Sequence, residues 1–340
     1  MIHGPAFPEQ PVLARVWRGD HVESQHRGSW ALVDGTGEVL EGAGNWNAPI
    51  YTRSAVKVLQ ALPLVETGAA DRFGLGPDEL ALALASHNGE DLHTAGAAKM
   101  LGRLDLDEGS LLCGAHYPDD PIVRARLGAA GEKPGPLHNN CSGKHAGFLT
   151  LAKHLGADIA GYLDPTGPVQ LAVRTAVGEV ASIEPTALEF AIDGCSAPTW
   201  RMPLSSLGRA FAAVTTPAPL GAGRAAACER LTAAAAEFPA HVAGNHRRLC
   251  TALLRASDGR LFPKIGAEGV YVVGQRGANR ALVAKIDDGG NRALHALVTA
   301  LLERFGWLGS GPLESLHVFR GKPLHNRAGL EVGRIEVCLP

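Results

Sequence analysis

Strand-like segments stand at both ends of this chain of 340 residues, and a long, mostly helical stretch separates them. Near the beginning, residues 11–42 contain β-branched and aromatic runs on either side of a turn at 34–37. The same kind of pattern returns late in the chain, in the runs at 261–264, 270–273, 281–286 and 330–337. Strands at both ends with helices between them predict one antiparallel sheet that the two chain ends share.

The middle of the chain, from about residue 54 to 240, has a helical pattern that one strand-like run, at 188–192, interrupts. Another helix is expected from about 291 to 305. We expect this late helix to cover one face of the sheet and the helical middle to cover the other. The predicted fold class is therefore α/β, of the α+β type, in a single domain over residues 1–340. The sheet part is expected at about 1–50 and 255–340, and the helical part at about 51–254.

Composition and charge exclude several classes of function. The chain is 46% hydrophobic and 19% charged, with a formal net charge of -2 and no basic block that would bind nucleic acid. Apolar runs such as 80–85 are far too short to span a membrane. The first residues lack the regions of a secretory signal, and six cysteines are too sparse for a disulfide framework. We therefore expect a cytoplasmic protein with reduced thiols and with neither nucleic-acid nor membrane partners.

Three short motifs contain the residue types of a serine acylation site. They are S-x-x-K at 54–57, S-x-N at 86–88 and K-x-G at 264–266, in that order along the chain. Each motif alone arises by chance, but the set supplies a serine nucleophile, a lysine base and a wall for the substrate. In the predicted fold, Lys264 runs along the edge of a cleft between the sheet and the helices, where S-x-x-K would also lie.

Ser54 and Lys57 would point the same way in a helix, because positions i and i+3 share a face. An apolar periodic run over 55–64 indicates a helix that begins near Ser54 and ends near Gly68. A lysine whose pKa is lowered by burial or by a second cation can take a serine proton. The alternative interpretation is structural, with Ser54 capping the helix and Lys57 in solvent.

A second polar cluster lies at residues 138–145, where a helix-like run begins. Its Cys141 and the later Cys195 offer two thiolates, which suit a borderline ion such as zinc. The two histidines of the segment are further candidate ligands, and Lys144 binds metal only as a neutral amine. The spacing is not that of a zinc finger. The alternative is a loop in which asparagines cap a helix and cysteines fill apolar gaps.

Five segments together resemble the rhizobial-type, or class 3, L-asparaginases, also called the asparaginase II family. These segments are 51–57, 85–90, 138–145, 193–198 and 264–269. The resemblance implies a fold similar to serine β-lactamases and glutaminases, and hydrolysis of L-asparagine to L-aspartate and ammonia. It also implies a homodimer and a zinc ion near the active serines. The implied Ser–Lys pairs are Ser54 with Lys57 and Ser86 with Lys264, and the implied zinc ligands are Cys141, Lys144 and Cys195.

Within this scheme we assign Ser54 as the nucleophile and Lys57 as its base, and we expect Ser86 and Lys264 to relay protons and to hold Lys57 neutral through a nearby positive charge. Ser86 as nucleophile, with Ser54 in support, remains an alternative. Because two thiolates make zinc a poor Lewis acid, we expect the metal to order substrate-side loops rather than to activate water.

Substrate binding is assigned to Arg53, Asn88 and Ala267. The backbone N–H groups of Ser54 and Ala267 are the expected oxyanion donors. Arg53 is expected either to bind the α-carboxylate of the substrate or to pair with Asp193, and the sequence leaves both readings open.

Other functions fit parts of the same pattern. The site would also serve a glutaminase, or a serine β-lactamase or penicillin-binding relative, although no deacylating glutamate can be placed. A non-enzymatic binding module would be expected to lack one member of the Ser–Lys pairs, and all four residues are present. A thiol hydrolase would use Cys141 or Cys195, of which only Cys141 has a histidine, His145, at helical spacing.

Overall fold

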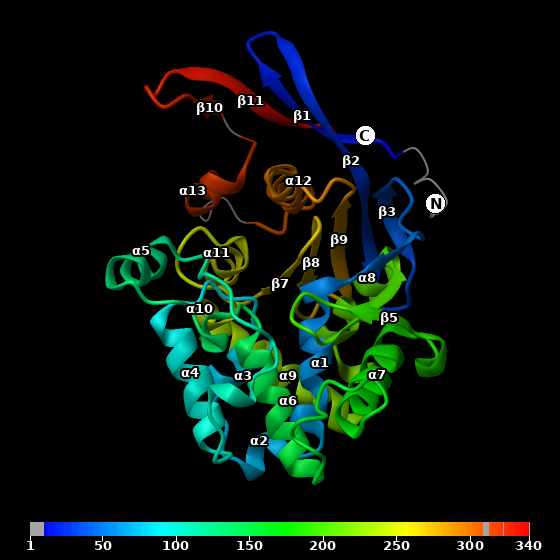
Figure 1. Ribbon diagram of the computed structural model, residues 1–340. Helices are drawn as coiled ribbons and strands as arrows, with labels where there is room; N and C mark the ends of the chain where they lie inside the picture. The colour runs from blue at the N-terminus through cyan, green and yellow to red at the C-terminus, as the bar shows by residue number, and fades with distance from the viewer. Residues whose placement is uncertain (1–9, 309–312, 322, 340) are drawn as a thin grey trace, which may run out of the picture.

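The structure, a computed structural model, describes residues 10–308, 313–321 and 323–339. A large sheet extends over a body of helices, and its outer strands project beyond that body (Figure 1). In the described ranges this sheet has eight strands in the order β10-β11-β1-β2-β9-β8-β7, with β3 beside β2, and each pair is antiparallel. A second, three-stranded sheet has the order β4-β6-β5.

The strands of the large sheet are β1 (Val12–Arg18), β2 (His21–Asp34), β3 (Val39–Ala43), β7 (Leu261–Gly266), β8 (Val270–Gln275), β9 (Arg280–Ile286), β10 (Pro323–His325) and β11 (Glu331–Val337). Those of the small sheet are β4 (Pro49–Tyr51), β5 (Glu189–Ile192) and β6 (Pro198–Pro203). The α-helices are α1 (Lys57–Glu66), α2 (Ala69–Arg72), α3 (Pro77–Ala83), α4 (Asp91–Gly102), α5 (Pro121–Ala130), α6 (Ser142–Leu155), α7 (Pro168–Ala181), α8 (Leu204–Thr215), α9 (Ala222–Glu237), α10 (Pro239–Ala243), α11 (Leu249–Ala256), α12 (Asn291–Arg304) and α13 (Leu313–Leu316). Short 3-10 helices are η1 (Arg53–Val56), η2 (Glu108–Ser110), η3 (Pro136–His138), η4 (Pro185–Ala187), η5 (Ala218–Leu220) and η6 (His317–Phe319).

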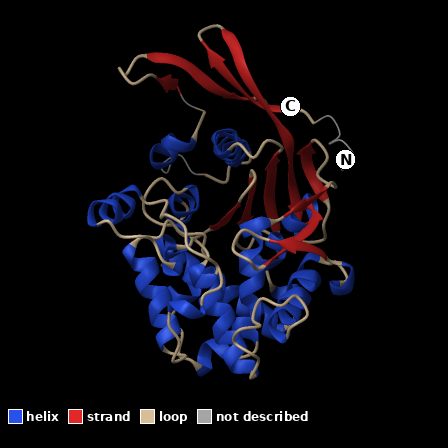
Figure 2. Ribbon diagram, in the orientation of Figure 1, coloured by secondary structure: helices blue, strands red, loops and turns tan. Residues whose placement is uncertain are grey.

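The two ends of the chain meet in the large sheet, as predicted. Strand β2 pairs with β9 from Gly28 opposite Ile286 to Asp34 opposite Arg280. Strand β1 pairs with β11 on the other side. The helices gather between these strands in sequence and below them in space (Figure 2). The α+β prediction, with an antiparallel sheet from both chain ends and a helical middle, is confirmed.

The two faces of the sheet bury their side chains in two different cores. On β9, Ala281 and Val283 belong to the core shared with the helical body, whereas Leu282 and Ala284 belong to a core with α12. This alternation follows from the period of two residues in a strand. Helix α8 contacts β2, β8 and β9 on the first side, and α12 contacts β1, β9 and β11 on the second. The prediction of helices on both faces is confirmed.

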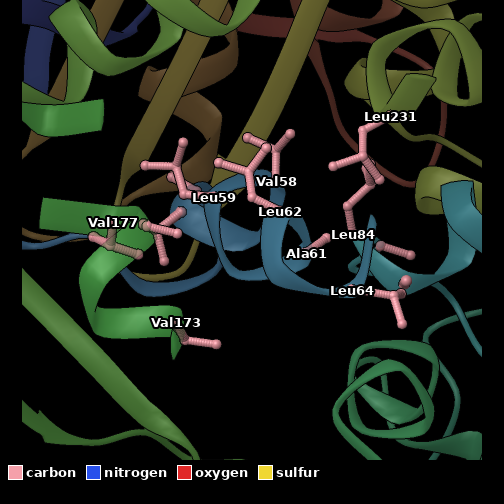
Figure 3. Close-up of a cluster of buried hydrophobic side chains, with 14 of the residues drawn as sticks. Val58, Leu59, Ala61, Leu62, Leu64, Leu84, Val173, Val177 and Leu231 are labelled. Atoms are coloured by element: carbon pink, nitrogen blue, oxygen red, sulfur yellow. The ribbon is translucent and has the colours of Figure 1, made fainter. Parts of the chain in front are cut away.

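Helix α1 lies in the middle of the helical body. Its residues from Lys57 to Leu64 are all buried, which is typical of a helix surrounded by protein on every side. Around it, Val173 and Val177 approach from α7, and Leu231 approaches from α9 (Figure 3). This packing fixes the first turn of α1, and with it the position of Lys57.

The small sheet was not expected in full. The sequence predicts β5, but no strand was assigned at β4, at the border of the expected sheet and helical parts, and β6 falls in the part expected to be helical. Strand β6 is bounded by Pro198 and Pro203, which read as loop residues in a sequence. Its stability comes from tertiary burial, because Thr199, Trp200 and Met202 are all buried. In the described ranges, no helix is long and apolar enough to cross a membrane.

Candidate active site

A cavity of about 500 Å³ opens where the end of β7 faces the loops of the helical body. Four of the predicted site residues line it, namely Ser54, Ser86, Asn88 and Ala267. It is also lined by residues that the sequence analysis did not select, among them Asn140, Arg247, Arg248, Cys250, Tyr271 and His295. The cavity therefore brings together residues from three of the five segments of the resemblance, and a fourth contributes Asn140.

Ser54 lies in η1, directly before α1, and its side chain is half-buried. The end of β7 passes close to η1, since a Cβ at Gly266 would stand 2.7 Å from the carbonyl oxygen of Thr52. Only glycine permits this approach, which brings Ala267 to the same wall as Ser54. Among the described residues, no hydrogen bond joins Ser54 Oγ to Lys57 Nζ, although the two residues are three positions apart.

The amines of two buried lysines converge on the hydroxyl of Ser86. Lys264 Nζ lies 2.8 Å from Ser86 Oγ and Lys57 Nζ lies 3.1 Å from it. Lys57 also donates to the carbonyl oxygen of Ala85 at 2.5 Å, and Lys264 to that of Ile265 at 3.1 Å. The four residues of the two predicted Ser–Lys pairs thus lie at one site, but Lys57 is directed at Ser86.

Two ammonium groups at one hydroxyl would repel each other. The surroundings of Lys264 favour its neutral form, which removes this repulsion. Its pKa is well below the ordinary value, first because burial disfavours the charged amine and then because the charge of Lys57 is near. A neutral Lys264 has a lone pair that can accept the proton of Ser86. The geometry therefore supplies a base at hydrogen-bond distance from a serine in the cavity wall.

The thiol cluster adjoins this site through Lys57, whose Nζ lies 3.1 Å from Cys141 Sγ. Cys141 precedes α6, and Lys144 on the first turn of that helix donates to Cys195 Sγ at 3.0 Å. A hydrogen bond from Cys195 holds the pKa of Cys141 well below its ordinary value, against the opposing effect of burial and with help from both lysines. The same hydrogen bond raises the pKa of Cys195.

Lys144 is buried like Lys264, yet its charge state is opposite. Burial lowers its pKa, but the sulfurs of Cys195 and Cys141 outweigh burial and raise the pKa above the ordinary value. A metal ion at this position would have to displace the proton that Lys144 holds.

The donor set can be tested against zinc from the chemistry of its atoms. Two sulfurs and the Lys144 amine converge, and the His145 Nε2 atom is buried without a hydrogen-bond partner in the described part of the chain. Sulfur and nitrogen donors of this kind suit zinc. No group of three His, Cys, Asp or Glu side chains is placed to hold a metal among the described residues. The set therefore fits zinc only with lysine as a ligand.

Arg53 occupies a different place from the other predicted substrate-binding residues. It does not line the cavity, and its guanidinium pairs with Asp193 at 2.7 Å and 2.9 Å. Burial raises the pKa of Asp193, but Arg53 more than offsets this and lowers it. Arg53 also has a φ of 48°, a strained left-handed conformation directly before Ser54. Of the two readings open in the sequence, the structure has the ion pair with Asp193.

The histidines near the site have structural hydrogen bonds. His87 accepts a bond from the Gly89 N–H at Nδ1, so its Nε2 carries the proton and donates to Ser142 Oγ at 3.0 Å. His145 Nδ1 lies 2.6 Å from the Tyr162 hydroxyl. Burial lowers the pKa of both rings, so both are neutral at pH 7.

Arg248 is the main site residue that the sequence analysis missed. It directly precedes α11 and donates to Asn88 Oδ1 at 2.7 Å and to the carbonyl oxygen of Ser86 at 2.5 Å. No local motif surrounds it, and its partners are about 160 positions away in sequence. Only the fold could have revealed it.

A protein-family model matches nearly the whole chain. The family model described as L-asparaginase II matches residues 14–337. No curated protein matches the chain. Among solved structures, the chain is similar to Mglu in its native form in 4.3 M NaCl, with 13% identity and a TM-score of 0.43. That match covers 82% of this chain and 61% of Mglu, so the chain spans less than two thirds of that protein.

The chain is also similar to a β-lactamase from Mycobacterium bovis, with 16% identity and a TM-score of 0.40, over 82% of this chain and 94% of that one.

Proposed function

The chain belongs to the L-asparaginase II family, and from that premise we propose that it hydrolyses L-asparagine to L-aspartate and ammonia. The observation that supports the chemistry is the convergence of the Lys57 and Lys264 amines on Ser86 Oγ, in the wall of a cavity that Ser54 also lines. Amide hydrolysis needs a nucleophile, a base for its proton and an acid for the leaving ammonia, and this group offers all three.

In the proposed reaction, the hydroxyl oxygen of Ser54 attacks the side-chain amide carbon of asparagine. Its proton passes by way of Ser86 to the neutral amine of Lys264, which here takes the role of base that the sequence analysis assigned to Lys57. The backbone N–H groups of Ser54 and Ala267 stabilise the negative oxygen of the tetrahedral intermediate. The lysine then gives the proton to the amide nitrogen, the C–N bond breaks and ammonia leaves. Water hydrolyses the resulting ester by the same route and releases aspartate.

A second candidate nucleophile is Ser86, and a specific observation favours it. Its Oγ is directly hydrogen-bonded to both amines, whereas Ser54 Oγ has no such bond to a lysine among the described residues. In this version Ser54 would support the substrate and Lys264 would take the Ser86 proton directly. The two versions share the base and the oxyanion donors, and they differ in which serine is acylated.

We propose zinc as a cofactor held by Cys141, Lys144 and Cys195, with His145 Nε2 as an adjoining nitrogen. Bound there, zinc would supply a fixed positive charge that ties the start of α6 to the loop after β5. The chain's own residues would then keep the cavity wall in place, because Asn140 and Cys141 adjoin Lys57. A homodimer, as the resemblance implies, and a cytoplasmic location are part of the same proposal.

The test is ammonia release from L-asparagine and from L-glutamine, measured in parallel for the wild type, Ser54→Ala and Ser86→Ala. Loss of a nucleophile is expected to lower turnover on the order of 10⁴-fold or more. Mass spectrometry of the protein during turnover then locates the acyl group on one serine. Absence of ammonia release from asparagine by the wild type, with zinc supplied, would contradict the proposal, and faster release from glutamine would change the substrate.

A further inference from the structure

An arginine that hydrogen-bonds only to uncharged oxygens among the described residues lies in the wall of the active-site cavity. Two arginines line the cavity, Arg247 and Arg248. Arg247 is exposed, whereas the side chain of Arg248 is 18% exposed and fixed by hydrogen bonds. In the described part of the chain, the Arg248 guanidinium hydrogen-bonds to two uncharged oxygens, Oδ1 of Asn88 and the carbonyl oxygen of Ser86.

The nearest carboxylate only partly offsets this charge. Asp119 Oδ2 lies 3.8 Å from Arg248 Nη1, beyond hydrogen-bond distance, and the Asp119 side chain is 57% exposed. An exposed carboxylate at this distance is screened by water and contributes little. Arg53, the other arginine near the site, is by contrast in direct contact with Asp193. The positive charge of Arg248 is therefore available to an anionic ligand, whereas that of Arg53 is already paired with Asp193.

The position of Arg248 matches what an amino-acid substrate requires. Its guanidinium donates to the carbonyl oxygen of Ser86, and both lysine amines converge on the hydroxyl of the same residue, so the cation lies beside a residue of the proposed proton route. Its two bonds to the 86–88 segment hold the planar group in one orientation. A fixed guanidinium is suited to binding a carboxylate through paired hydrogen bonds.

We propose that Arg248 binds the α-carboxylate of the substrate and thereby selects free amino acids over simple amides. This inference rests on the proposed function for the identity of the substrate. It replaces Arg53 as the carboxylate-binding residue and gives Asn88 a role in holding Arg248. The α-carboxylate then orients the side-chain amide toward the serines.

The test uses binding, so that it does not depend on turnover. L-Aspartate and β-alanine differ only in the α-carboxylate, and isothermal titration calorimetry measures both. We expect the wild type to bind aspartate more tightly, and Arg248→Gln to weaken aspartate about 10- to 100-fold while changing β-alanine by less than about threefold. Arg247→Gln removes the same charge one residue away and is expected to leave both affinities within about threefold.

If thermal unfolding shows that Arg248→Gln is not folded, Arg248→Lys takes its place in the test, because lysine retains the positive charge. It is expected to weaken aspartate by an intermediate factor and to spare β-alanine. Equal weakening of both ligands would overturn the inference, since Arg248 would then act by holding Ser86 and Asn88. A wild type that binds aspartate no better than β-alanine would overturn it too. If Arg248 proves necessary for aspartate binding but the wild type releases no ammonia, the carboxylate-binding role of Arg248 is supported and the asparaginase proposal fails.

Discussion

Two lysines of this protein are equally buried and have opposite charge states. Lys264 is 1% exposed and Lys144 is 3% exposed. The partners of Lys264 are a hydroxyl and a carbonyl oxygen, and its pKa is well below the ordinary value. Lys144 lies against two sulfurs, and its pKa is raised. Burial alone therefore does not decide the charge of a lysine; the anions beside it do. Lys264 can accept a proton, and Lys144 can balance the negative charge that the thiol cluster carries.

The largest expected effect comes from removing the neutral lysine. Lys264→Met is expected to lower kcat/KM for asparagine about 10²- to 10⁴-fold, because the base is lost. The same change should leave the melting temperature unchanged or higher, since methionine needs no burial of a polar group. Ammonia release and thermal unfolding check the two expectations. A clear drop in melting temperature would show that the Lys264 amine stabilises the fold and would break the comparison.

The matching change in the thiol cluster should act in the opposite direction. Lys144→Met removes the buried cation that donates to Cys195 Sγ and helps to lower the Cys141 pKa, and we expect a loss of about 3–5 kcal/mol in the free energy of unfolding. Chemical denaturation without added zinc measures it. Lys153→Met, an exposed position on the same helix, is the control and should cost less than about 0.5 kcal/mol. An equally small effect at Lys144 would mean that the thiols simply take up protons.

Zinc should affect stability more than it affects the chemical step. At a free zinc concentration of 100 times its Kd, we expect the folded state to gain about 2.7 kcal/mol. Cys195→Ser should remove most of this gain. Thermal unfolding with and without zinc measures the gain in stability, and elemental analysis measures the amount of bound metal. An increase in melting temperature that persists in Cys195→Ser would place the metal elsewhere.

The smallest effect concerns pH. Lys264 must be neutral to act as a base, so kcat/KM should fall as the pH drops through its pKa. Because that pKa is lowered in the folded protein, the acid limb should lie below the ordinary lysine value of 10.5. Beneath the limb, the rate should fall about tenfold per pH unit, or about 1.4 kcal/mol. A limb at 10.5 or above would mean that Lys264 keeps its proton at neutral pH.

The sequence predicted those parts of the molecule that depend on local pattern. The strand at β9 was visible as a short apolar run bounded by turn residues, and the helical run around α1 was visible from its apolar period. Strand β6 was not visible, because its two prolines resemble a loop and its burial comes from distant segments. The S-x-x-K motif located the right residues and left their contacts open. Lys57 is long enough to reach past Ser54 to Ser86. Its buried amine needs hydrogen-bond partners, and it finds them at Ala85 and Ser86.

Residues whose roles depend on tertiary contacts stayed hidden. Nothing near Arg248 in sequence indicates that it meets Asn88, and nothing around Arg53 decides between Asp193 and a ligand. Periodicity reports which face of an element is buried, but it does not report which distant group a long side chain reaches. Arginine and lysine are the residues for which this difference matters most.

The pairing of β2 with β9 also sets an order of events during synthesis. Strand β2 leaves the ribosome about 250 residues before its partner, and Ser54 and Ser86 leave well before Lys264. At about 5–20 residues per second, the helical body has more than ten seconds in which to form while one edge of β2 waits unpaired. Lys264, the proposed base, is synthesised as part of β7, shortly before β9 pairs with the open edge of β2. Completion of the sheet and completion of the active site are therefore the same late step, and an unfinished chain is inactive.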